Sequence, residues 1–182
     1  MRKLWLLIAL CCLALAVPAF ADILIIGNPP DCGSGNCFPY GCPYNAEYQQ
    51  VYTKSQFPNQ TITISDLYFY NTQYNSGASS LPTGNFTVTL AESTADWNSI
   101  SGNYASNLAG SQNVQQVFSG PIAGPWSFGN TLDIHLTTPY TYDPNQGNLL
   151  MDVVGSGVSL PTNIYFDVHS GTNYFTRVRT PL

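Results

Sequence analysis

The sequence has very little charge, and most of the charge it has is negative. Lys, Arg, Asp and Glu together make up 8% of the 182 residues, against roughly 25% in an ordinary globular domain. Five Lys and Arg stand against ten Asp and Glu. Because proteins bind phosphate backbones through clustered cations, this composition argues against nucleic acid as a partner.

The chain also lacks the signatures of an enzyme. It contains no Gly-x-Ser-x-Gly motif, and neither of its two histidines lies in a catalytic motif. Ten carboxylates in a β domain will include some neighbours by chance, so they do not identify a glycosidase pair. We therefore expect no catalytic residues, with a hydrolase acting on extracellular polymers as the last alternative.

An apolar leader opens the chain. A basic pair at positions 2 and 3 precedes an apolar run at 4–17, and Ala19-Phe20-Ala21 comes before Asp22. The run is shorter than the ~20 residues that cross a bilayer. Residues 1–21 are therefore predicted to be a secretory signal peptide. No later segment is apolar enough to span a membrane, and the mature chain is expected to be secreted.

Three of the five cysteines follow the leader, at Cys32, Cys37 and Cys42. An odd number leaves one thiol over, and loop-closure entropy does not select the pair, because the competing loops differ by under ~1 kcal/mol. The intervening Phe38-Pro39-Tyr40-Gly41 places Pro and Gly where they favour a turn. We predict a disulfide between Cys37 and Cys42, with a zinc site on the three cysteines as the alternative.

From about residue 48 onward, short runs of alternating apolar and polar residues are separated by Gly, Pro, Asn and Ser. This pattern predicts an antiparallel all-β domain. The alternation slips phase at Asp66, which predicts a β-bulge. About eight strands are expected, at 48–52, 60–71, 86–90, 114–118, 132–136, 149–154, 164–168 and 174–178.

The expected architecture is a two-sheet β-sandwich with jelly-roll or Greek-key connections, because strands with one apolar face each must bury those faces against one another. A cysteine-containing segment at 22–47 is expected to pack on this domain, which spans 48–182. The stretch 93–108 has apolar residues at helical spacing, but Gly102 and several Ser weaken the pattern. We expect a long loop there with one or two helical turns.

Two tryptophans and one turn are candidate binding sites. Trp97 and Trp126 are candidates to stack on sugar rings, although a single aromatic ring more often fills a core. In Asp143-Pro144-Asn145-Gln146-Gly147, the oxygens of Asp143 and Asn145 are spaced as at the opening of a calcium loop. Val154 stands where an EF-hand loop needs a bidentate Glu, so an Asx-Pro turn is the favoured interpretation.

The two histidines each follow an Asp by two residues, in Asp133-Ile134-His135 and Asp167-Val168-His169. Since strand side chains alternate, Asp133 and His135 share one outer face, and Asp167 and His169 share another. If the two strands are neighbours, these four side chains form a zinc or other divalent-metal site. If they are not, the chain has two separate, solvated pairs, which is the simpler interpretation.

Several stretches of the chain resemble secreted bacterial proteins of the PEP-CTERM class. They are Asn-Cys-Phe-Pro-Tyr-Gly-Cys at 36–42, Tyr-Gln-Gln-Val-Tyr at 48–52, and the stretches 62–70, 116–120, 142–144, 147–153 and 175–178. The resemblance implies a β-sandwich, export and sorting by an exosortase, and it brings no catalytic residues. The chain ends at Arg179-Thr180-Pro181-Leu182 and departs there from the Pro-Glu-Pro motif, apolar helix and basic tip of the class.

These observations lead to one expected function. The chain is expected to be a non-enzymatic structural or adhesive protein of the cell envelope or extracellular matrix, with extracellular polysaccharide or other matrix components as partners. A glycan-binding module is the alternative. No cofactor is expected, apart from the calcium and zinc alternatives above.

Overall fold

The structure is a computed structural model that describes residues 22–27, 29–42, 47–169 and 175–179. The predicted signal peptide lies outside these residues. The described part contains nine strands, one 3-10 helix and one α-helix. They are β1 (Gly35–Asn36), β2 (Glu47–Tyr52), η1 (Lys54–Gln56), β3 (Ile62–Tyr70), β4 (Thr83–Ser93), α2 (Tyr104–Ala109), β5 (Ser111–Gly120), β6 (Thr131–Tyr142), β7 (Asn148–Ser159), β8 (Phe166–Asp167) and β9 (Phe175–Arg179).

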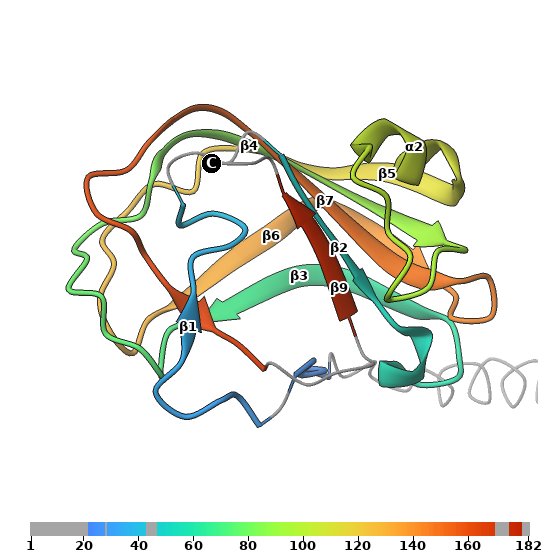
Figure 1. Ribbon diagram of the computed structural model, residues 1–182, viewed down its shortest axis with the longest axis horizontal. Coiled ribbons are helices and arrows are strands. Elements are labelled where there is room, and N and C mark those ends of the chain that lie inside the picture. The colour runs from blue at the N-terminus through green and yellow to red at the C-terminus, as the bar shows by residue number, and fades with distance from the viewer. Residues whose placement is uncertain (1–21, 28, 43–46, 170–174, 180–182) are drawn as a thin grey trace, which may run out of the picture.

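The strands form one large sheet and two strand pairs. The large sheet has five strands in the order β5-β4-β7-β2-β9, while β3 pairs with β6 and β1 with β8. Every pairing is antiparallel. The prediction of an antiparallel all-β fold is therefore confirmed. In the view of Figure 1, β2 and β9 cross in front of β3 and β6.

The main core lies between the five-stranded sheet and the β3–β6 pair. Along β6 the side chains of Leu132, Ile134 and Leu136 are buried, whereas the intervening Asp133 and His135 are exposed. They join Val88, Leu90, Met151 and Val153 of the large sheet in one apolar cluster. Alternation along each strand thus gives one face to the core and one to solvent.

The predicted irregularity in β3 is present. The pairing register between β3 and β6 shifts between Ile64 and Asp66, as expected from the phase slip in the sequence. Because of this shift, Ile62 and Ile64 before the bulge and Leu67 and Phe69 after it all pack against the core, although the alternation changes phase between them.

The two sheets meet at β5 and β6. The Thr137 hydroxyl donates to the Val117 carbonyl (2.9 Å), and the Asn113 side-chain amide donates to the Thr141 carbonyl (2.9 Å). At the other side, β3 pairs only with β6 and β9 only with β2 within the described residues. A gap therefore separates β3 from the β2–β9 edge of the large sheet, and we call it the seam.

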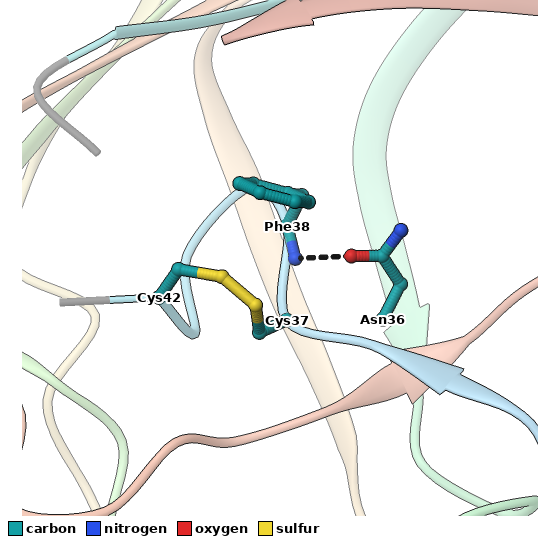
Figure 2. Close-up of a disulfide and its surroundings, with 4 residues drawn as sticks. All are labelled: Asn36, Cys37, Phe38 and Cys42. Carbon is teal, nitrogen blue, oxygen red and sulfur yellow. Dashed lines mark hydrogen bonds between the residues drawn. A yellow bond between two sulfur atoms is a disulfide. The ribbon is translucent and has the colours of Figure 1, made fainter. Parts of the chain in front are cut away.

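The predicted disulfide between Cys37 and Cys42 is confirmed. Figure 2 shows it beside Asn36, whose side-chain oxygen accepts a hydrogen bond from the Phe38 N–H (3.1 Å). The Gly41 N–H donates to the Cys37 carbonyl (2.5 Å) and closes the turn. Cys32 is a free, exposed cysteine.

The ring of Tyr40, inside the disulfide loop, anchors the N-terminal segment. It is buried and packs edge-on against Phe69, Phe86 and Phe166, with ring centroids 5.1, 5.2 and 6.2 Å away. These rings come from β3, β4 and β8, so the loop contacts both sides of the core. The disulfide holds this contact together because it restricts the chain on both sides of Tyr40.

A cap covers the outer face of the large sheet. It consists of residues 94–110 and contains α2, whose first turn is capped by the Asn103 side chain accepting from the Ser106 N–H (3.1 Å). Ile100 and Leu108 of the cap pack on the buried Val51, Ala91 and Leu150. The short helix within a longer loop agrees with the sequence prediction. Within the described residues, no helix is long and apolar enough to cross a membrane.

Candidate functional site

A large cavity lies at the seam, and we call it the seam cleft. It has a volume of about 1150 Å³ and is lined by β2, β3, residues 22–27 and the disulfide loop. Its floor reaches the buried side chains of Leu90, Leu149 and Met151. This cleft exists because the β3–β6 pair is narrower than the five-stranded sheet opposite it.

A few polar groups line the seam cleft. The exposed Arg177 places its guanidinium carbon 5.0 Å from the centre of the Phe38 ring, a cation–π distance. The Tyr48 hydroxyl donates to the Gln50 side-chain oxygen. Burial raises the pKa of Tyr48, and the nearby Arg177 opposes that rise, so the phenol stays protonated at neutral pH.

A second, smaller cavity lies at the N-terminal end of β6, and we call it the outer cavity. It has a volume of about 570 Å³ and is lined by the loop 121–126 and by residues 130–135, together with Leu81 and Phe118. The exposed Asp133 and His135 belong to its wall. Phe128, which lies between these two lining segments in the sequence, is 50% exposed.

Of the two tryptophans that are candidates to stack on sugar rings, Trp126 lines the outer cavity. Trp126 lies in a loop, as expected, but it is only 3% exposed, and its ring centroid lies 5.6 Å from that of Phe166 in the core. Trp97 is half-buried in the cap and lines neither cavity. The two tryptophans therefore lie on opposite faces of the large sheet. The sequence indicated that the 121–130 segment is a loop, but it did not indicate the direction in which the Trp126 ring points.

The four predicted metal-ligating side chains on β6 and near β8 do not come together. The strand β6 pairs with β3, whereas β8 pairs with β1. Within the described residues, no three His, Cys, Asp or Glu side chains are grouped to hold a metal ion. The hypothesis of a joint site on Asp133, His135, Asp167 and His169 is thus corrected.

Each histidine instead faces a different carboxylate. The Nδ1 atom of His135 lies 2.6 Å from Oδ1 of Asp66, across the β-bulge. His169 lies 3.5 Å from Asp31 in the N-terminal segment. Asp167 accepts hydrogen bonds from the N–H groups of Thr72 and Gln73 (2.7 and 2.9 Å). It therefore holds a loop in place.

The turn at Asp143 has the Asx geometry that the sequence favoured over a calcium loop. The Asn145 N–H donates to the Asp143 side chain (2.9 Å), and the Gln146 N–H donates to the Asp143 carbonyl (3.0 Å). The hydrogen bond from the Asn145 N–H lowers the pKa of Asp143. The Asp143 N–H in turn donates to the buried Glu92 (2.9 Å), which ties the turn to β4.

A polar network under the cap was missed by sequence reasoning. Asp152 is 3% exposed and accepts from the Gln49 side chain (3.0 Å). The Asn107 side-chain amide donates to Gln49 from the cap (2.8 Å), and Tyr104 donates to the Glu47 carbonyl (3.3 Å). The signal in the sequence was an Asp inside the apolar run at 149–154. Such a residue must be hydrogen-bonded if the strand is buried on both faces.

The two carboxyl groups of this network share a proton. Burial, together with the neighbouring Asp152 carboxyl, raises the pKa of Glu47 to about 7. Burial also raises the pKa of Asp152, while hydrogen bonds from Gln49 and Glu47 oppose that rise. One carboxyl group therefore stays protonated below neutral pH.

Comparisons with known proteins identify no relative. No protein-family model, no curated protein and no solved structure matches the chain. The resemblance to the PEP-CTERM class accordingly stays a prediction, and the site must be judged from its geometry alone.

The Asp66–His135 pair leads to a testable prediction. The hydrogen bond to Asp66 raises the pKa of His135, and hydrogen bonds from Ser65 and then His135 lower the pKa of Asp66. We expect the imidazole to titrate above its usual value of about 6.5 and to return to it in Asp66→Asn. This pair stabilises the folded state at pH values below the usual histidine pKa. That stabilisation is lost as the pH rises through the raised pKa of His135.

Proton NMR of the His135 ring across a pH series measures this shift directly. Asp133→Asn is the matched control, because Asp133 is only the weakest of the influences on this histidine. An equal change of the His135 pKa in both variants would contradict the pairing.

Proposed function

We propose that this protein is a secreted, non-enzymatic adhesive component of the cell envelope or extracellular matrix, and that it holds neutral polysaccharide at the outer cavity. The observation that carries the proposal is the outer cavity itself. Its volume of about 570 Å³ falls within the range of roughly 300–1,000 Å³ typical of ligand pockets. Asp133, Thr131 and Asn130 in its wall supply hydrogen-bonding groups for hydroxyls.

The composition supports a neutral ligand. With 8% charged residues, the surface offers amides and hydroxyls in place of ion pairs, which suits sugar hydroxyls. Phe118, a half-buried residue in the wall of the cavity, provides an apolar ring face on which a sugar can stack. The disulfide supports the secreted location, because such bonds persist in oxidising compartments.

Affinity electrophoresis of the protein through gels that contain neutral polysaccharides tests the proposal. We expect retardation in at least one gel, and Phe118→Leu, which keeps an apolar side chain against the core, is expected to weaken binding about three- to tenfold, the value of one aromatic stacking contact. Tyr74→Leu is the matched control, since Tyr74 is also aromatic but lines neither cavity. Because the polysaccharide is uncharged, added salt should leave the retardation unchanged.

The same experiment separates the alternatives. Retardation that is lost in salt, or that falls equally in both variants, contradicts a stacking site at the outer cavity. Release of reducing ends from the polysaccharide would identify a hydrolase and refute the non-enzymatic role.

A further inference from the structure

The seam cleft combines an apolar interior with an apolar rim. Inside, it is bounded by Leu149 and Met151 from β7 and by Leu67 and Phe69 from β3, which belong to opposite sheets. Protein interiors are normally packed as densely as organic crystals. A cleft of about 1150 Å³ between two sheets thus leaves room for a molecule that is itself mainly hydrocarbon.

The rim is formed in part by three consecutive aliphatic side chains of the N-terminal segment. Ile23, Leu24 and Ile25 line the cleft and are 66%, 46% and 52% exposed. Exposed apolar residues that occur singly need no explanation, but a contiguous group beside a cavity marks an interaction site. This group gives a hydrocarbon chain an apolar surface to cross on its way into the cleft.

The charged side chains that line the cleft favour one kind of head group. Within the described residues, Arg177 is the Lys or Arg side chain that lines it. The carboxylates of Asp22, Asp66 and Asp167 also line the cleft. Asp66 is engaged by His135, and Asp167 by the backbone N–H groups of Thr72 and Gln73. The guanidinium has five N–H donors and matches a carboxylate in geometry. A singly charged head group is favoured over a doubly charged one, because these acidic neighbours repel negative charge.

We propose that the seam cleft binds a long-chain carboxylate, with its hydrocarbon tail between the two sheets and its head group on Arg177. This proposal does not depend on the outer cavity or on polysaccharide binding.

Fluorescence titration of the full chain with a dansyl-labelled undecanoic acid, followed by displacement with unlabelled carboxylates, tests the proposal. We expect saturable binding of one molecule per chain. Affinity should rise about threefold to fourfold for each methylene added between octanoate and dodecanoate, as expected for burial of hydrocarbon. Dodecanol should displace the probe about tenfold less well than dodecanoate, since it lacks the charge that pairs with Arg177.

Two substitutions locate the head group. Arg177→Gln is expected to weaken dodecanoate binding about tenfold and to leave dodecanol binding unchanged. Lys54→Gln is the matched control, because Lys54 is an exposed cation that does not line the cleft. Circular dichroism of both variants, compared with the parent chain, establishes that they are folded.

Three results would overturn the proposal. They are an absence of saturable probe binding to the folded chain, an affinity independent of chain length, and equal losses in Arg177→Gln and Lys54→Gln. Displacement of the probe by neutral polysaccharide would also refute it, because the cleft would then be the glycan site.

Discussion

Replacing Gly41 by Ala is expected to destabilise the fold by about 2–4 kcal/mol, among the larger effects of a single added methyl group. A Cβ at position 41 would lie 2.3 Å from the Ile164 carbonyl oxygen and 2.5 Å from the Ile164 Cγ1. It would also lie 2.9 Å from the Cys37 carbonyl oxygen. These are mostly backbone atoms, which do not move aside as a flexible side chain does. The disulfide loop would have to shift away from Ile164, and Tyr40 would lose its packing.

Thermal unfolding followed by circular dichroism measures this effect. A loss of 2–4 kcal/mol corresponds to a fall in Tm of about 5–15 °C for a domain of this size. Gly102→Ala is the matched control, because a Cβ at Gly102 meets nothing within 4 Å. Similar Tm values for the two variants would show that the close approach to Ile164 is not required.

The second large effect concerns pH and the carboxyl pair under the cap. Because the folded state raises the pKa of Glu47 to about 7, the folded chain holds a proton that the unfolded chain releases above about 4.3. The stabilisation is therefore present at pH 4 and is lost as the pH rises from about 4.5 to about 7. Glu47 is only partly buried, so we discount the effect for solvent screening to about 1 kcal/mol.

Calorimetric Tm values between pH 4.5 and pH 7.5 test this prediction. We expect a fall of about 2–4 °C across this interval in the parent chain and a much flatter profile in Glu47→Gln. Asp96→Asn, an exposed carboxyl of the same cap, should follow the parent. If Glu47→Gln retains the slope of the parent chain, the shared proton is not the cause.

This pH response would act on the cap. Ile100 and Leu108 pack the cap on the sheet, and hydrogen bonds that include the one from Asn107 to Gln49 add polar contacts. Ionisation of both carboxyl groups places like charges beneath this network. Weaker protection of the cap amides in hydrogen exchange above neutral pH would accompany the fall in Tm.

Several features were determined by local sequence. Alternating apolar residues placed Leu132, Ile134 and Leu136 in the core with Asp133 and His135 outside, and the phase slip at Asp66 located the bulge. Turn chemistry between Cys37 and Cys42 selected the disulfide partners. These features depend on side-chain period and on φ preferences within a few residues of the chain, and both can be read from the sequence.

Tertiary structure alone decided where the cavities and charged pairs lie. Alternation assigns a residue to a face, but it does not say which strand lies beside it or what covers that face. The partner of His135 is therefore Asp66, 69 residues away in the sequence, and Trp126 turns into the core despite its loop. The buried Asp152 and the open seam likewise follow from strand order, which is set by long-range contacts that a local pattern does not encode.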